Sequence, residues 1–582
     1  MQLSGLDQII IALFFLVSLI IGIAVSRKAG TSSQEFFLSG RNMPWWLLGV
    51  SMVATTFSAD TPNLVTDIVR KNGVAGNWVW WSFLLTGMLT VFVYAKLWRR
   101  SGVLTDLEFY EIRYGGKGAA FLRGFRAIYL GVFFNVMIMA TVCLAAIKIG
   151  GVMLGLSPVQ SVVIAGSVTV IYSLLGGLRG VLITDFFQFI LAMVGTVWAA
   201  NVVLDLPQVG GLENLLANER VGELTSFFPD FSDTENLIPL LVIPLAVQWW
   251  SVWYPGAEPG GGGYIAQRML AAKDERHAMG ATLFFNIAHY ALRPWPWIII
   301  ALCSVVVFPD LASIGAAFPD LDPSIIDDDL AFPAMLTFLP AGLLGLVVAS
   351  LIAAFMSTIS THLNWGSSYV VNDFYVRFIN KEASDRKQVL VGRISTLLLM
   401  VLAAIFALML SNALQAFNIL LQIGAGTGLI FILRWFWWRI NAWTEISGMV
   451  ISFLVAIYFE LIHPALGFGE LASHFKLVAG VGITTIGWLT VTLLTAPEKE
   501  EVLRGFCKRI NPTSGWKEYR LEGTEDGQLP LQILGMFLGC LAVYCFLFGT
   551  GAIIYGNLAM GFGLFALASL CMFIIFRNWK KF

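Results

Sequence analysis

The sequence predicts an all-α, polytopic membrane protein whose core is an inverted repeat of two five-helix halves. Hydrophobic residues make up 57% of the 582 residues and charged residues only 13%, about half the charged share of a soluble protein. About fifteen apolar segments are long enough to cross a bilayer core. Two of them, in corresponding places, are broken at membrane depth. This composition excludes a soluble enzyme and a nucleic-acid-binding protein.

No stretch between the expected spans has the composition of a soluble domain, and the longest polar insert is a loop at about residues 496–528. Walker A, HExxH and GxSxG signatures are absent. The six cysteines lack metal-binding or disulfide spacing. We therefore expect neither an ATP-driven pump nor an enzyme. The expected spans cover about residues 8–26, 45–69, 76–98, 121–150, 157–176, 180–204, 237–258, 278–308, 332–370, 390–411, 414–438, 443–464, 474–495, 529–550 and 555–576.

Basic residues gather in alternate loops, and this bias predicts the orientation of the chain. With the N-terminus outside, about thirty of the 36 Lys and Arg residues fall in cytoplasmic loops, as the positive-inside rule requires. The loops 205–236 and 309–330, expected outside, are acidic. The first apolar run, 9–25, lacks a basic flank and a cleavage site, which is typical of a retained helix. We expect a multi-pass protein of the plasma or inner membrane with a cytoplasmic C-terminus.

Two spans are interrupted by residues that destabilise a helix. Residues 55–63 are mostly polar, acidic or Pro, and residues 254–263 contain two prolines and a run of four glycines. Such breaks free backbone groups that lipid cannot satisfy. Unwound helices at matching places in two halves are typical of a secondary transporter's binding site. Because the first broken span opens a set of five helices and the second opens the next set, the odd number inverts the second half relative to the first. Two ordinary Pro kinks in packing helices are the alternative.

A stripe of hydroxyl groups lies on the expected span 332–370. Ser357, Ser360 and Thr361 stand at i, i+3 and i+4 and share one helix face, with Thr358 beside them. Neutral oxygens grouped in this way suit a hard monovalent cation. The alternative is that they bond to the preceding helical turn or join neighbouring helices.

Asp185 lies about one and a half turns inside the expected span 180–204. A carboxylate at that depth is costly unless it meets a cation, a proton or water. Asp185 is therefore either an ion ligand or an acid stabilised by the positive end of its helix. The residues alone leave both interpretations open.

Several motifs resemble those of the sodium:solute symporter family, whose members include sodium–glucose, sodium–proline and sodium–sialic acid transporters. The resemblance runs from about residue 8 to residue 445 and implies the leucine-transporter (LeuT) fold. The motifs are Ser39-Gly40-Arg41-Asn42-Met43, Gly176-Gly177 with Thr184-Asp185, Gln267-Arg268-Met269-Leu270-Ala271-Ala272-Lys273, Ala354-Phe355-Met356-Ser357-Thr358 and Val371-Asn372-Asp373-Phe374-Tyr375.

The resemblance also implies a division of the chain. Residues 45–438 form the transporter core, in two inverted halves at 45–204 and 237–438. About one extra helix, in residues 1–44, precedes the core with a cytoplasmic loop. About four peripheral helices, in residues 439–582, follow it and include the loop 496–528.

Contacts with ions and solute are implied residue by residue. A first sodium site uses the carbonyls of Ala54, Phe57 and Ala354 and the hydroxyls of Ser357 and Thr358. Asp185, Ser360 and Thr361 match a second site that some members have, so one or two sodium ions are expected. The positions that touch the solute are Asp60, Thr61, Arg293 and Gln422.

The sixth core helix departs from the family pattern. Gly260 to Gly263 stand where many relatives carry an Asp-Gln or Asn-Gln pair before the Gln-Arg motif. The equivalent solute contacts are therefore open between Gln248, Trp249, Trp250 and Glu258. Trp78 is a further candidate for stacking on a sugar face, with the aromatic belt as its alternative role.

These observations lead to an expected function. We expect a sodium-coupled symporter that imports a small polar solute by alternating access, with a sugar or sugar acid first. A proline-like amino acid or another carboxylate is the alternative solute, and a transporter-like sensor is a further alternative. The expected partners are sodium, the solute and the lipid bilayer, with no nucleic acid and no obligatory protein partner.

Overall fold

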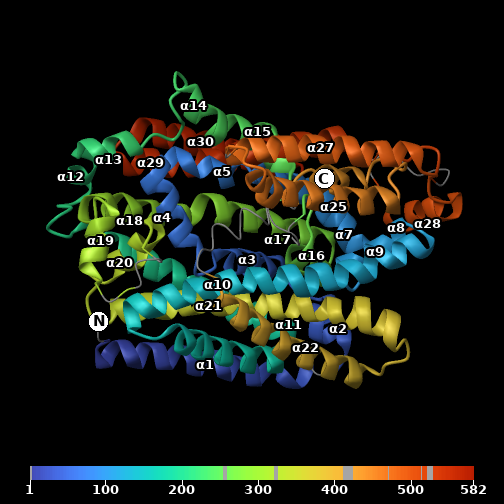
Figure 1. Ribbon diagram of the computed structural model, residues 1–582, viewed down its shortest axis with the longest axis horizontal. Coiled ribbons are helices and arrows are strands. Elements are labelled where there is room, and N and C mark those ends of the chain that lie inside the picture. The colour runs from blue at the N-terminus through green and yellow to red at the C-terminus, as the bar shows by residue number, and fades with distance from the viewer. Residues whose placement is uncertain are drawn as a thin grey trace.

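The computed structural model describes residues 3–29, 31–252, 258–319, 321, 326–410, 424–469, 471–512, 514–520 and 528–582. These described residues form helices and no named β-strand, which confirms the all-α prediction. The helices run roughly along the long axis of one elongated bundle (Figure 1). The site described below lies where the helices of this bundle are interrupted.

Among the described residues, 11 helices are long and apolar enough to cross a membrane, fewer than the fifteen or so spans expected. The difference comes mainly from interrupted segments. Trp45–Phe57 and Pro158–Ile171 are shorter apolar helices, and 237–258 is divided into short pieces. Residues 414–423 of the expected span 414–438 lie outside the described residues.

The first half of the core opens with the break that the sequence predicts. α3 (Trp45–Phe57) ends where Ser58 takes a positive φ of 36°, and α4 begins at Thr61 with Pro62 in its first turn. Pro is tolerated there because that turn has no partner for its N–H. The other main helices of this half are α5 (Trp78–Trp81), α6 (Leu84–Leu89), α7 (Ala95–Ser101), α9 (Gly116–Ile128), α10 (Asn135–Ile149) and α11 (Pro158–Leu204); α4 spans Thr61–Asn72.

α11 contains both of the expected spans 157–176 and 180–204. It changes direction at Gly177, whose φ of 52° and ψ of −160° are not helical. A Cβ at this position would lie 2.8 Å from the carbonyl oxygen of Phe36. The break therefore requires glycine, both for its backbone angle and for the close approach of another segment.

The second half of the core repeats the interruption. Its sixth helix consists of short turns up to η8 (Gln248–Trp250), followed by α16 (Gly263–Ala271). The expected span 332–370 is two helices, because Pro340 and Gly342, with φ of 88°, separate them. The main helices that follow α16 are α17 (Glu275–Ile287), α18 (Pro294–Val307), α20 (Ala331–Leu336), α21 (Leu343–Ser368), α22 (Asp385–Ala407) and α24 (Gly428–Leu433).

Extra helices flank the core on two sides (Figure 1). α1 (Gly5–Ala29) packs against α11 and α21. On the other side lie the C-terminal helices, of which α29 contacts α30 and α6. Their bounds are α25 (Ala442–Ile457), α27 (Ser473–Leu494), α28 (Glu500–Ile510), α29 (Leu529–Ile554) and α30 (Leu558–Arg577).

Asp7 of α1 fixes the start of α21, the helix that carries the hydroxyl stripe. Its Oδ1 accepts hydrogen bonds from the backbone N–H groups of Gly342 and Gly345, each at 2.7 Å. The first N–H groups of a helix have no intrahelical partner, so a carboxylate from another helix can satisfy them. α1 thereby helps to set the position of α21 in the core.

We predict that Gly345→Ala destabilises the protein by about 1–3 kcal/mol, as overpacking of a close contact does. The new Cβ would lie 2.5 Å from the Cα of Asp7. Thermal unfolding of the purified protein checks this prediction. Gly482→Ala is the matched control, because it adds a methyl group to another helix, α27, where no atom lies within 4 Å. Equal melting temperatures for the two variants would contradict the close contact between α1 and α21 at Gly345.

Candidate functional site

The last turn of α3 presents backbone carbonyls inside the bundle. Because the helix ends at Phe57, its last four carbonyls lack intrahelical partners. Thr358 Oγ1 donates to the carbonyl of Thr55 at 2.9 Å, and Thr61 Oγ1 donates to that of Thr56 at 3.4 Å. Among the hydrogen bonds of the described residues, none reaches the other two carbonyls of this turn, at Ala54 and Phe57.

The hydroxyl stripe of α21 faces this turn. Thr358 joins the two helices, since its Oγ1 also lies 3.1 Å from the carbonyl of Ala354. Ser357 is fully buried; its Oγ makes no hydrogen bond of standard geometry in the described residues, but it lies close enough to the Asp185 carboxylate to interact with it. α3 and α21 thus bring together the segments that the sequence assigned to a first sodium site. Such neutral oxygens from an unwound turn and a neighbouring helix suit Na⁺.

Asp185 lies in a second polar group. It is fully buried, and Ser51 Oγ donates to its Oδ2 at 2.5 Å. Its Oδ1 has no partner in the described part of the chain. Thr361 Oγ1 lies 3.0 Å from Thr55 Oγ1, and Ser360 Oγ donates to the carbonyl of Ser357 at 3.1 Å. Buried acceptors without donors fit a cation, which offers positive charge without a proton.

Sequence reasoning missed two residues of this group and one buried amide on the same helix as Asp185. Ser51 and Arg268 form hydrogen bonds within the group. Gln188 is 2% exposed, and neither polar atom of its side chain has a partner among the described residues. Gln188 follows Asp185 by three positions on α11, a spacing that places both on one face. The spacing could have identified Gln188 from the sequence. No pattern in the sequence predicts the contacts of Ser51.

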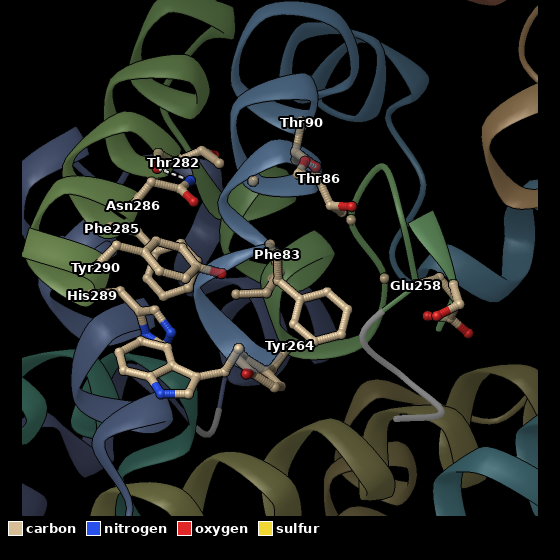
Figure 2. A pocket seen from close by; sticks show the side chains of 16 residues that line it. Phe83, Thr86, Thr90, Glu258, Tyr264, Thr282, Phe285, Asn286, His289 and Tyr290 are labelled. Atoms are coloured by element: carbon tan, nitrogen blue, oxygen red, sulfur yellow. Dashed lines mark hydrogen bonds between the residues drawn. The ribbon is translucent and has the colours of Figure 1, made fainter. Parts of the chain in front are cut away.

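A partly open pocket lies beside these groups, between the second, sixth and seventh core helices. Figure 2 shows Asn286, Phe285, His289 and Tyr290 on one side and Thr86 and Thr90 on another, with Glu258 at the far end. His289 connects the pocket to the broken helix, because its Nδ1 lies 3.1 Å from Thr56 Oγ1. The pocket and the possible ion sites are therefore adjacent.

The pocket combines aromatic faces with hydrogen-bonding groups. The ring of Trp80 stacks on that of Tyr290, with centroids 5.8 Å apart. Asn286 donates to the carbonyl of Thr282 at 2.8 Å, while its Oδ1 is buried without a partner in the described structure. A Cβ on Gly87 would lie 1.8 Å from this oxygen, so glycine is needed to leave room for Asn286.

Of the four candidates on the sixth core helix, Glu258 lines the pocket and the other three lie outside its wall. Gln248 Nε2 donates to the carbonyl of Val79 at 2.6 Å, and Trp250 Nε1 to that of Ala246 at 2.9 Å. The carbonyl of Trp249 accepts a hydrogen bond from Thr86. These contacts stabilise irregular backbone within the bundle.

The remaining predicted solute contacts also lie outside the pocket wall as described. Trp78 packs in an aromatic cluster with Tyr544 and Phe548. Asp60 and Thr61 are at the start of α4. Arg293 lies behind the pocket residue His289, with Nη2 3.3 Å from Nε2. Gln422 falls outside the described residues.

A glycine-rich segment forms one wall of the pocket and is fixed at three points. Arg126 pairs with Glu258 at 2.6 Å, Trp98 Nε1 donates to the carbonyl of Gly260 at 2.8 Å, and the N–H of Gly263 donates to Asp106 at 2.9 Å. Burial, together with the nearby charge of Glu258, raises the pKa of Asp106 to about 6. The unwound part of the sixth helix is therefore held mainly by polar contacts.

Comparison with known proteins places this geometry among membrane transporters. The chain is similar to a sodium/glucose cotransporter of Vibrio parahaemolyticus, with 26% identity over 80% of this chain and 87% of the relative. It is 24% identical to sodium/glucose cotransporter 1 of Oryctolagus cuniculus, over 93% and 88% of the two chains. Sodium/myo-inositol cotransporter 2 of Sus scrofa is 26% identical, over 86% and 78%.

A solved structure shares the fold. It shows a Na⁺-coupled sialic acid symporter in a substrate-bound outward-open state and matches with a TM-score of 0.68. The match covers 85% of this chain and 99% of that one at 20% identity. The fold is therefore of the LeuT type, as predicted.

The sodium:solute symporter family model matches residues 36–452. This range includes α3, α11, α16 and α21, which hold the broken helix, the hydroxyl stripe and Asp185. The relatives are cotransporters, so the prediction that the chain is not an enzyme is confirmed. Because the match covers well over half of the 582 residues, the chain belongs to the sodium:solute symporter family.

Proposed function

We propose that this protein imports a small polar organic solute, a sugar or sugar acid first, together with sodium by alternating access. One observation carries the proposal. The carbonyls of Ala54 and Phe57 lie in the last turn of α3, which Thr358 joins to the helix that carries Ser357, and the pocket residue His289 contacts Thr56 in the same turn. A sodium ion bound between α3 and α21 would stabilise the broken helix that borders the solute.

The pocket supports a hydroxylated solute. Its faces are aromatic at Trp80, Phe285 and Tyr290, and such faces pack against the apolar side of a sugar ring. The unpartnered buried oxygens of Asn286 Oδ1 and Glu258 Oε2 are both acceptors. A solute rich in O–H donors satisfies them, whereas leaving them desolvated costs about 1–3 kcal/mol each. The relatives named above transport glucose or myo-inositol, which agrees with this class.

A carboxylate-bearing solute is the second candidate, and Arg293 favours it. This guanidinium is 2% exposed and lies 5.3 Å from the ring centroid of Trp297. Among the described residues, none of the ion pairs includes Arg293. A buried cation beside the pocket residue His289 offers a partner to a sugar acid or a proline-like amino acid.

The membrane placement follows from the charge of the loops. We infer a plasma or inner membrane protein with its N-terminus outside and its C-terminus in the cytoplasm, because basic loops face the cytoplasm. The division into an extra helix at 1–44, a core at 45–438 and peripheral helices at 439–582 follows the family pattern. Sodium, in one or two copies, is carried with the solute.

Uptake by purified protein in liposomes tests the proposal. Labelled glucose, mannose, myo-inositol, glucuronate and proline are offered with an inward sodium gradient, with a proton gradient in sodium-free medium, or with neither. We expect sodium-driven accumulation of at least one sugar or sugar acid. Uptake of proline alone would favour the second candidate, and uptake driven fully by protons would contradict sodium coupling.

We predict that Ser357→Ala raises the sodium concentration needed for half-maximal uptake about tenfold, since one lost ligand costs on the order of 1.4 kcal/mol. Ser367→Ala is the control. Ser367 lies on the same helix, is fully buried and donates only within α21, to the carbonyls of Leu363 and Asn364. It should leave the sodium dependence unchanged. The same dependence in both variants would exclude Ser357 from the ion site.

Arg293→Gln separates the two solute candidates. Removing the guanidinium should weaken competition by glucuronate by about tenfold or more, the value of a charge-assisted hydrogen bond. Competition by glucose should change little. The measurement is inhibition of labelled solute uptake by each compound. If both compounds lose affinity equally, Arg293 stabilises the pocket without reading the charge of the solute.

A further inference from the structure

Arg268 is a cation built into the second polar group. It is fully buried on α16. Its Nη2 donates to Thr361 Oγ1 at 2.7 Å and to Ser51 Oγ at 3.2 Å. Ser51 in turn donates to Asp185 Oδ2 at 2.5 Å. The guanidinium is therefore linked to the Asp185 carboxylate through the Ser51 hydroxyl, and it donates a hydrogen bond directly to the Thr361 hydroxyl.

Sodium at this place would need the same atoms. A site made from Asp185 and Thr361 uses the lone pairs of Thr361 Oγ1, towards which Arg268 directs an N–H group. Two cations at one buried carboxylate also repel each other strongly in a medium of low dielectric constant. Arg268 and a sodium ion are thus alternative occupants, and the unpartnered Oδ1 of Asp185 remains available to the ion.

Arg268 also has a direct connection to the solute pocket. Tyr264 stands four residues earlier on α16, and both Tyr264 and Ile265 line the pocket. α16 packs against α3 and α21, the helices of the first ion site. Before α16, the chain has positive φ values at Gly260 and Gly261. A movement of Arg268 that carries α16 with it would therefore also move residues of the pocket wall.

We propose that Arg268 is a tethered counter-cation of Asp185 that sodium displaces, and that this exchange couples ion binding to α16 and the pocket. The proposal rests on the sodium symport proposed above and adds a positioning residue to it. When sodium is absent, Arg268 neutralises Asp185 and holds α16 against α3 and α21. When sodium binds Asp185, Arg268 is released and α16 is free to move.

Sodium binding to purified protein, without solute, tests the exchange. We measure binding of ²²Na⁺ to the wild type, Arg268→Gln and Arg268→Lys. Removing the competing charge should tighten sodium binding about tenfold in Arg268→Gln, since a neighbouring cation no longer opposes the ion. Arg268→Lys keeps a cation and should remain near the wild type. A purely structural role of Arg268 would predict weaker binding in Arg268→Gln.

Arg434→Gln is the matched control. Arg434 is also buried, at 4% exposure, but it pairs with Glu445 of the peripheral helix α25, at 3.4 Å. It has no contact with Asp185 among the described hydrogen bonds and ion pairs. Its loss should leave the sodium affinity of the folded protein unchanged. Tighter sodium binding in this variant as well would show that any lost guanidinium has the effect and would contradict the proposal.

A second measurement covers the case in which Arg268→Gln does not fold. The double variant Asp185→Asn with Arg268→Gln keeps the interior neutral. In the wild type, sodium should increase hydrogen–deuterium exchange of the α16 amides, Gly263–Ala271, and the double variant should show no such increase. The Hill coefficient of sodium binding should be near two in the wild type and close to one in the double variant. If sodium increased hydrogen–deuterium exchange of α16 as much in the double variant as in the wild type, the proposed displacement of Arg268 by sodium would be wrong.

The two proposals fail in different ways. If the wild type neither binds sodium nor shows sodium-driven uptake, the symport proposal is wrong. If the wild type does both, but Arg268→Gln binds sodium no more tightly than the wild type, symport stands and the exchange is wrong.

Discussion

The interruption of the first core helix between Phe57 and Thr61 is the constraint on which the rest of the site depends. A helix that ends inside a bilayer leaves carbonyl groups that lipid cannot satisfy. The protein supplies two donors, from Thr358 and Thr61, and the carbonyls of Ala54 and Phe57 are available to the sodium ion that we propose. α21 must therefore lie close to α3, and the anchoring of α21 by Asp7 contributes to that position.

Several buried charged side chains in this protein are paired with a side chain of opposite charge. Arg126 pairs with Glu258 within the core, and Arg434 pairs with Glu445, which joins the core to the peripheral helix α25. Breaking such a pair leaves an uncompensated charge and is strongly destabilising. Asp185 and Arg268 differ, because a hydroxyl stands between them and they form no direct ion pair. A cation held through a hydroxyl can be exchanged at lower cost than one that is paired directly.

Much of the fold was predictable because it depends on local chemistry. Apolar runs locate most spans, and Pro and Gly mark the breaks at residues 58–60 and at Gly260 to Gly263. The number of spans was harder to predict, since a short or broken helix such as α3 does not satisfy a length criterion. Pro340 and Gly342 likewise shorten the expected span 332–370, because they separate α20 from α21.

The candidate site was predictable where one helix or one motif carries it. Ser357, Ser360 and Thr361 follow from helical spacing, and Asp185 from its depth. Residues that depend on contacts between distant segments were not. The positions of Glu258 on the pocket wall and of Gln248 on the carbonyl of Val79 follow from the path of an unwound chain, which no periodicity describes. The role that we propose for Arg268 depends on its contact with Thr361, a residue 93 positions away in the sequence.

The most direct test of the central claim is the equilibrium affinity of the purified protein for its solute in sodium chloride and in choline chloride. The solute is the sugar or sugar acid that the uptake panel identifies. If a sodium ion completes the broken turn of α3 beside the pocket, the solute should bind markedly more tightly in sodium. Equal affinity in the two salts would contradict the account, because the ion would then contribute nothing to the structure of the pocket.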